Sequence, residues 1–371
     1  MQLAELEKCN GKKKPLYVQI GGQIRTQIER GVLRPGQQIP SVSQIVRQFG
    51  VDYRTVYQAM EVLQDEGLLG PVKSRGVGPT VIKQSAVKLD IVFIRWGHDS
   101  LSLELTEGVR LYGERKGHKT TIVDASLSHE RYIEAIRSQA SRADGLIIFP
   151  QDGAEYEDVI SKVMALNVKI VLVDRQLYNG HANVVSVDNI DGAYKATKHL
   201  LETHGGPVFY IGSADSPSSS RDRFKGWGTA MQHYNFETDD HYVYRLELSE
   251  YELAPKNNLG FECSYSAAMA LFKEHKQEHY SIFCTNDNTA KGVYKAANEL
   301  GLKIGKDIFL AAFGDTPLCK ALPVSLTSVK QENERVGYEA ARLLDELCVG
   351  NVTTVTEIRL PVELCIRASS I

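Results

Sequence analysis

Apolar residues follow two different periodicities along this chain, one before and one after residue 88. In the first part they recur at mostly helical spacing from Val18 to Ile28, which predicts a helix over Leu16–Arg30. In the second part, short continuous apolar runs alternate with helix-length segments. The pattern therefore predicts a small, largely helical domain followed by a larger α/β domain.

Two more helices are predicted directly after the first. Ser41 follows Pro40 and can cap a helix that ends at Gly50, and Asp52 can cap another that ends at Gly67. A tight turn between two such helices is typical of a helix–turn–helix unit. The inner face of the last helix is predicted to consist of Val56, Ala59, Met60 and Leu63.

A pair of short strands is expected next. Leu69–Ser74 and Val77–Ile82 flank Arg75-Gly76, which predicts a hairpin with two basic residues at its tip. A basic hairpin beside a helix–turn–helix unit is suited to contact with phosphates or with the minor groove. We expect residues 1–82 to form a winged helix–turn–helix domain (α+β) and residues 83–88 to form a polar linker.

Residues 89–371 are predicted to form a second, α/β domain. Continuous apolar strands separated by helices indicate parallel sheets that are covered on both faces, and this length suits two doubly wound lobes better than one. We expect the chain to cross between the lobes near residues 187, 316–331 and 350. The predicted strands are Leu89–Ile94, Thr120–Val123, Gly145–Phe149, Ile170–Val173, Val208–Ile211, Ser281–Cys284 and Ile308–Phe313. The predicted helices include Leu103–Lys116, His129–Ser141, Glu155–Ala165, Gly192–Thr203, Asn286–Leu300 and Asn333–Leu347.

Charge is distributed unevenly between the two parts. The first 88 residues hold 13 Lys and Arg against 7 Asp and Glu, a net charge of +6, whereas the whole chain carries −3 and the remainder therefore −9. A basic module ahead of an acidic one indicates a nucleic-acid-binding domain joined to a domain of another kind. The chain has six cysteines without a CxxC pair, no signal-peptide pattern and no membrane-length apolar run. We therefore expect a cytoplasmic protein with reduced cysteines.

The basic module resembles the GntR family of bacterial winged-helix regulators. The matching residues are Pro40-Ser41, Gly50-Val51, Thr55-Val56, Leu63, Glu66–Leu69 and the glycines of Gly76–Gly78. The chain departs from the family pattern at Val42-Ser43, where Glu-Arg is usual, and at Tyr53, where an arginine is common. The operator is therefore expected to differ from the commonest sequence of the family.

The outer face of the third helix is predicted to contact bases, because a helix fits the major groove. An alternative is a helical dimerisation module with a solvated basic face, but that reading leaves the charged hairpin unexplained. The predicted DNA-binding residues are Ser41, Arg47, Tyr53, Arg54, Thr55, Tyr57, Gln58, Lys73, Arg75 and Gly76.

Polar residues cluster where predicted strands end in the second part. Asp174-Arg175, Asn286-Asp287 and Gly314-Asp315 each follow a strand, and Trp96 follows the first strand. Carboxylates accept hydrogen bonds from paired hydroxyls, Arg and Asn donate to sugar oxygens, and an indole ring stacks on the C–H face of a pyranose. Ligands bind at the carboxyl ends of such strands, so a sugar pocket is predicted there. Asp287 is also placed to cap the following helix.

The second part resembles the periplasmic-binding-protein-like sensor of the LacI family and the ribose-binding proteins over residues 89–369. The resemblance rests on the motifs at Val171–Arg175, Val187–Leu200, Ser220–Trp227, Asn286–Gly292, Phe313–Asp315, Ser328–Gln331 and Arg359–Arg367. It implies two lobes that close on a small effector. The pocket residues that it implies are Asp174, Arg175, Arg223, Asn286, Asp315 and Gln331, to which Trp96 and Gln151 are added from the loops after the first and third strands.

No motif indicates an enzyme or a bound metal. His275 and His279 lie four residues apart on a predicted helix, but they lack the glutamate and the third ligand of a zinc site. A P-loop and a nucleophile elbow are absent from the sequence. We therefore expect no catalytic residue, no metal and no cofactor.

The two resemblances together imply a transcription regulator of carbohydrate utilisation, similar to the chimeric GntR/LacI regulators of arabinose type. Its expected partners are double-stranded operator DNA, a second copy of the chain and a neutral sugar (a pentose, a 6-deoxyhexose or a hexose). A purine or a phosphorylated sugar is the alternative effector, although Asp174 and Asp315 would repel a phosphate. A transport-type solute-binding protein is the remaining alternative, which the winged module disfavours. Repression and activation both stay open from the sequence.

Overall fold

The computed structural model describes residues 15–71, 77–82, 88–125, 128–178, 182–215, 217–246, 259–350, 352 and 354–371. The chain separates into two compact units. The first contains the chain up to Leu89 together with the short segments Lys116–Lys119 and Leu343–Thr354, and the second contains the rest.

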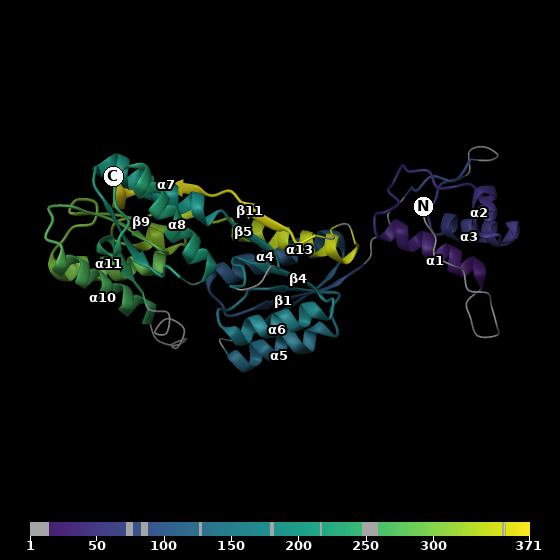
Figure 1. Cartoon of the computed structure of the whole chain (residues 1–371), viewed down its shortest axis with the longest axis horizontal. Coiled ribbons are helices and arrows are strands. Elements are labelled where there is room, and N and C mark those ends of the chain that lie inside the picture. Colours follow the sequence, from purple (N-terminus) through teal and green to yellow (C-terminus); the bar gives the residue numbers. More distant parts are fainter. Residues whose placement is uncertain are drawn as a thin grey trace. The chain divides into compact units, whose positions relative to one another are not determined.

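The first unit contains the three predicted helices, α1 (Leu16–Glu29), α2 (Val42–Phe49) and α3 (Tyr53–Asp65) (Figure 1). Ser41 and Gln44 cap the start of α2 reciprocally, because each side chain accepts a hydrogen bond from the backbone N–H of the other. The carboxylate of Asp52 caps α3 by accepting from the N–H of Arg54 at 2.9 Å. The helix–turn–helix prediction is confirmed to within one or two residues.

The core of this unit includes residues from the base of the predicted hairpin. The predicted inner face of α3 is buried against apolar residues of α1, and Leu69 pairs in antiparallel fashion with Val81. Gly78 lies so close to the carbonyl oxygen of Ile39 that an added Cβ would meet that oxygen at 1.8 Å, so only glycine fits there. The hairpin tip, with Lys73 to Gly76, lies outside the described residues.

The first sheet of the second unit has the strand order β11–β5–β4–β3–β1–β2, and β11, β5, β4, β3 and β1 pair in parallel. Figure 1 shows α5 and α6 on one side of this sheet and α4 and α13 on the other. The bounds are β1 (Asp90–Arg95), β2 (Lys119–Asp124), β3 (Gly145–Ile148), β4 (Lys169–Val173), β5 (Asn183–Val187), β11 (Glu357–Leu360), α4 (Ser100–Lys116), α5 (His129–Ala140), α6 (Ala154–Ala165) and α13 (Asn333–Cys348).

The second sheet has the order β12–β10–β9–β8–β6–β7 and is parallel except for β12, which pairs antiparallel with β10. Strands β6 and β8 are buried along their whole length, as expected for a sheet covered on both faces. The bounds are β6 (Val208–Gly212), β7 (Val243–Arg245), β8 (Tyr280–Cys284), β9 (Ile308–Gly314), β10 (Thr327–Lys330), β12 (Glu363–Cys365), α7 (Asn189–His204), α8 (Ser218–His233), α10 (Leu259–Glu274), α11 (Asp287–Leu300), α12 (Leu318–Ala321), η1 (Asp240–Tyr242) and η2 (Ala368–Ser370).

The chain passes between the two sheets at three places. It leaves the first sheet after β5, returns between β10 and α13, and leaves again between β11 and β12. The third crossing lies at Pro361-Val362, so its prediction near residue 350 is wrong. The reason is that Glu357–Leu360 first pairs with Val184–Val187 in the first sheet, and Pro361, which has no N–H to donate, then ends that strand.

The predicted fold class is confirmed, but several short elements were not predicted. Strands β5, β7, β11 and β12 have three to five residues each, and their patterns are too short to stand out. The expected helix through His275 and His279 ends at Glu274, so both histidines lie between α10 and β8. Within the described residues, no helix is both long and apolar enough to span a membrane.

Candidate functional site

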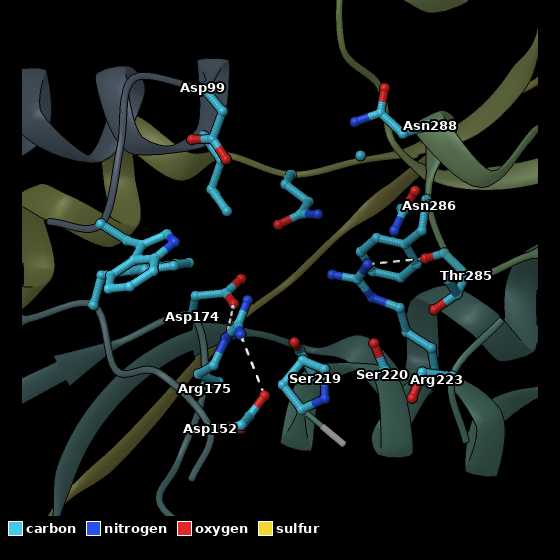
Figure 2. Close-up of a pocket in the computed structure, with 18 of the residues that line it drawn as sticks. Asp99, Asp152, Asp174, Arg175, Ser219, Ser220, Arg223, Thr285, Asn286 and Asn288 are labelled. Carbon is cyan, nitrogen blue, oxygen red and sulfur yellow. Dashed lines mark hydrogen bonds and ion pairs between the residues drawn. The ribbon is translucent and has the colours of Figure 1, made fainter. Parts of the chain in front are cut away.

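The second unit contains a cavity of about 490 Å³ at the carboxyl ends of strands from both sheets (Figure 2). Residues from the first sheet and its loops form one wall, and residues from α8, the segment after β8, α11 and β9 form the other. Of the eight predicted effector residues, the structure brings seven together in this lining: Trp96, Gln151, Asp174, Arg175, Arg223, Asn286 and Gln331.

Arg175 contacts two carboxylates and an aromatic ring in the wall formed by the first sheet. Its Nε lies 3.0 Å from Oδ2 of Asp174, its Nη1 lies 3.6 Å from Oδ2 of Asp152, and its guanidinium carbon lies 4.8 Å from the ring centre of Phe149. Burial lowers the pKa of Arg175, but Asp174 and Asp152 outweigh burial and leave this pKa raised. The wall therefore presents fixed carboxylate oxygens that can accept hydrogen bonds from a ligand.

Arg223 occupies the opposite wall in a different environment. Its Nε donates to Oδ1 of Asn189 at 2.8 Å, its Nη1 donates to the carbonyl oxygen of Thr285 at 2.9 Å, and its guanidinium lies 3.9 Å from the ring centre of Phe313. It is 6% exposed and forms no ion pair with any described residue, and burial lowers its pKa. Figure 2 shows the guanidinium pointing into the cavity, so its remaining N–H groups face a ligand.

An aromatic cluster and two unused polar atoms complete the lining. The ring centre of Trp96 lies 5.5 Å from that of His129 and 6.2 Å from that of Tyr156. The Tyr156 hydroxyl and Oε1 of Gln331 are buried without a hydrogen-bond partner in the described part of the chain. Buried polar groups are normally hydrogen-bonded, so both atoms are available for hydrogen bonds with a bound molecule.

Asp315 was predicted to line the pocket, but the structure places its side chain elsewhere. Its Oδ1 lies 2.6 Å from Nη2 of Arg367, in an ion pair whose two side chains are 12% and 14% exposed. A left-handed backbone (φ 51°) turns the chain at the end of β9. As a result Gly314 and Thr316 line the cavity and Asp315 does not.

The capping role expected for Asp287 belongs to Asn286. The side chain of Asn286 accepts from the N–H of Thr289 at 2.9 Å, which caps α11. Asp287 is the first residue of the helix and is 2% exposed. Its Oδ2 accepts from the N–H and the hydroxyl of Thr316, both at 2.8 Å, and burial raises its pKa.

The DNA-binding predictions fall on three kinds of position. Arg47, Tyr53, Arg54, Tyr57 and Gln58 are exposed on α2 and α3, and Thr55 is half-buried. The Ser41 side chain is instead engaged in capping α2, and the residue is 4% exposed. The predicted residues of the hairpin tip, Lys73, Arg75 and Gly76, lie outside the described part of the chain.

Comparison with known proteins gives a family match in each unit. Residues 16–78 match the family described as bacterial regulatory proteins of the gntR family, and residues 197–370 match a periplasmic binding protein-like domain. The chain joins a GntR-family DNA-binding domain to a periplasmic-binding-protein-like domain of the LacI type. These matches indicate a transcription regulator and not an enzyme.

The relatives of this regulator include an arabinose metabolism repressor and a PurR repressor. An arabinose metabolism transcriptional repressor of Geobacillus stearothermophilus is 24% identical and aligns over 97% of this chain and 98% of its own length. A transcriptional repressor PurR of Vibrio vulnificus is 25% identical over 66% of this chain and 69% of its own length. A LacI-family regulator of Enterococcus faecium with bound ribose superimposes with a TM-score of 0.62, at 20% identity over 76% of this chain and 98% of that one.

Several residues of the regulator's cavity were not predicted from the sequence. Asp152 follows the third strand directly after Gln151 and could have been found from that position, and Ser220 starts a motif that was used for Arg223. The remainder come from loops and helix starts whose register no periodicity sets. They include Asp99, His129, Tyr156, Ser219, Thr285 and Asn288. Phe313 also lines the cavity, and because it ends a predicted strand and begins the Phe313–Asp315 motif, it could have been found from that position.

Proposed function

We propose that this transcription regulator controls carbohydrate utilisation and that a small neutral sugar, a pentose, a 6-deoxyhexose or a hexose, controls its binding to operator DNA. The observation that carries the proposal is the cavity of the second unit. There Asp174 offers acceptors on one wall, Arg223 offers donors on the other, and Trp96 supplies an aromatic face. Donors and acceptors on opposite walls beside an aromatic ring suit the hydroxyls and the C–H face of a sugar.

The balance of charge favours a neutral ligand over a phosphorylated one. Asp99, Asp152 and Asp174 line the cavity with Arg175, which is already paired with two of these carboxylates. A phosphate that approached Arg223 would enter a lining in which Asp99, Asp152 and Asp174 outnumber the two arginines. Neutral hydroxyls avoid that repulsion and can still bridge the two walls.

The relatives support a sugar as the effector, and one of them also supports a purine as the alternative effector. The arabinose metabolism repressor of Geobacillus stearothermophilus aligns with nearly the whole chain, including the DNA-binding part. The PurR relative supports a purine as the second candidate effector, because a planar base could lie against Trp96 and Tyr156. A transport-type solute-binding protein would have no use for the GntR-family domain.

We further propose that the protein acts as a cytoplasmic homodimeric repressor. Both of these relatives are named repressors, which supports repression over activation. A homodimer is supported because two-fold symmetric proteins bind palindromic half-sites. In this proposal residues 1–82 bind DNA, residues 83–88 connect, and residues 89–371 bind the effector. The DNA-binding residues are those exposed on α2 and α3 together with Lys73, Arg75 and Gly76.

A thermal-shift panel on the full chain tests the effector class. The panel contains neutral monosaccharides, their phosphates and purines, each added to the wild type and to Asp174→Asn. We expect one neutral sugar to raise the melting temperature of the wild type and to lose most of this effect on Asp174→Asn. Stabilisation by phosphosugars or purines alone would overturn the neutral-sugar assignment and leave the DNA-binding half unaffected.

A further inference from the structure

The exposed face of α3 carries two aromatic rings that the core does not use. Tyr53 and Tyr57 lie one helical turn apart, their ring centres are 6.3 Å apart, and their planes differ by 16°. They are 55% and 48% exposed. The opposite face of α3, with Val56 and Leu63, already fills the core of the unit. The tyrosine pair, as we name Tyr53 and Tyr57, is therefore free to contact a partner.

The surroundings of the tyrosine pair indicate what that partner is. A tyrosine combines an apolar ring with a polar hydroxyl, and tyrosines are enriched at interfaces for this reason. Arg47 and Arg54 are exposed nearby in the sequence of α2 and α3 and form no ion pair with a described residue. The pair thus lies on a helix with free positive charge, in a unit with a net charge of +6 over the first 88 residues. Positive charge beside the rings is complementary to DNA.

We infer that the tyrosine pair is a specificity-determining surface that contacts the C5-methyl groups of thymines in the operator. This inference rests on the proposed DNA-binding function. In the major groove only thymine presents a methyl group, and apolar side chains contact it directly. A tyrosine has no guanidinium for bidentate contact with guanine. The two rings therefore select thymine, while Arg54, which follows Tyr53 in the sequence, remains available for contact with another base such as guanine.

The stacked geometry makes this selection effective. Each ring restrains the other through an i, i+4 contact, so little side-chain freedom is lost when DNA binds. The ring centres are separated by nearly two base steps of about 3.4 Å, so the pair spans two positions along a strand. We expect two thymine-selective positions per half-site.

The test uses the full chain and a randomised double-stranded DNA library. Sequences that bind are selected, and each thymine of the selected half-site is then replaced singly by deoxyuridine, which lacks only the methyl group. At two positions the affinity should fall about fourfold per methyl removed. Tyr53→Ala and Tyr57→Ala should each abolish the thymine–uracil difference at one position, whereas Tyr53→Phe and Tyr57→Phe should keep it. The control Leu166→Ala changes an apolar residue that is 75% exposed in the second unit, and it should change nothing.

The possible outcomes separate this inference from the proposed function. A defined selected sequence that binds equally well with thymine and uracil overturns the inference and leaves the regulator assignment intact. Loss of the difference in the Phe variants also overturns it, because the hydroxyl would then be the contacting group. Alanine variants that change the oligomeric state but keep the thymine–uracil difference would assign the tyrosine pair to a protein interface. Absence of any sequence-selective binding would contradict the proposed function itself.

Discussion

At the scale of single residues, the two buried arginines of the cavity have opposite electrostatic environments. Arg175 is held by two carboxylates, whereas Arg223 is held only by neutral oxygens and an aromatic ring. A charge that is buried without a counter-charge is costly. A ligand that accepts hydrogen bonds from Arg223 would offset part of this cost. Arg223 is therefore expected to contribute more to effector affinity than Arg175.

Arg223→Lys tests that expectation. Lysine keeps the charge but cannot hold Asn189 and Thr285 while it also donates to a ligand, so effector affinity should fall by about 1.5–3 kcal/mol. Calorimetric titration of the effector measures this loss. Arg221→Lys is the matched control on the same helix, because Arg221 faces the ring of Tyr178 and does not line the cavity. Equal losses in both variants would contradict the assignment.

The ion pair between Asp315 and Arg367 is predicted to stabilise the fold and not to bind the effector. Arg367→Met leaves a carboxylate that is 12% exposed without its cation, which should cost about 3 kcal/mol of unfolding free energy. The double variant with Asp315→Leu should recover part of this loss. Urea denaturation measures both. Unchanged stability in Arg367→Met combined with lost effector binding would restore Asp315 to the pocket.

Base readout and phosphate contact can be separated on the DNA-binding unit. Arg54→Ala should relax sequence preference at one base position, because the residue is exposed on the face of α3 expected to enter the groove. Lys73→Ala on the predicted wing should weaken all DNA about equally and lower the salt slope by about one. Binding titrations at several salt concentrations distinguish the two. If Arg54→Ala keeps its full sequence preference, the recognition face is assigned wrongly.

At the scale of elements, helix starts and strand ends decide which predicted residues become site residues. Ser41 was expected to contact DNA, but its hydroxyl caps α2, and Asn286 both caps α11 and lines the cavity. A cap fixes its side chain through local hydrogen bonds, so a polar residue at such a position has a structural role before any other.

Ser41→Ala should therefore act through stability. Loss of the reciprocal cap on α2 should cost about 1 kcal/mol of the unfolding free energy of the DNA-binding unit. Ser43→Ala, an exposed residue of the first turn of α2, is the matched control and should be close to neutral. Thermal unfolding of the full chain, followed together with DNA affinity, measures both effects. Weaker DNA binding by Ser41→Ala at unchanged stability would return the residue to the DNA contacts.

The periodicity of apolar residues also explains which helices and strands could be predicted from the sequence. Long amphipathic helices and continuous apolar strands such as Ile170–Val173 were predicted within a few residues, because burial imposes their pattern. Strands β11 and β12 have four and three residues and depend on pairing with distant strands, which no local pattern reveals. The position of Asp315 depends on a left-handed backbone at the end of β9. The expectation that a polar residue directly after a strand faces the pocket does not take such a turn into account.

At the scale of the whole molecule, the chain unites a reader of DNA with a sensor of a small molecule. Seven of the eight predicted pocket residues, from Trp96 to Gln331, meet in one cavity although they are distant in sequence. The carboxyl ends of parallel strands in two sheets bring them together, so topology fixed the site more firmly than any single motif. We expect a ligand bound in that cavity to change the affinity of the protein for operator DNA.

The most direct test is operator affinity of the full chain, measured by fluorescence anisotropy with neutral monosaccharides, their phosphates or purines added in turn. We predict that one neutral monosaccharide changes operator affinity by about 5- to 150-fold. The same sugar should have a much smaller effect on Arg223→Lys, whose operator affinity without sugar should match the wild type. A response to phosphosugars or purines alone, or the same sugar response in Arg223→Lys and the wild type, would contradict control of operator binding by a neutral sugar in this cavity.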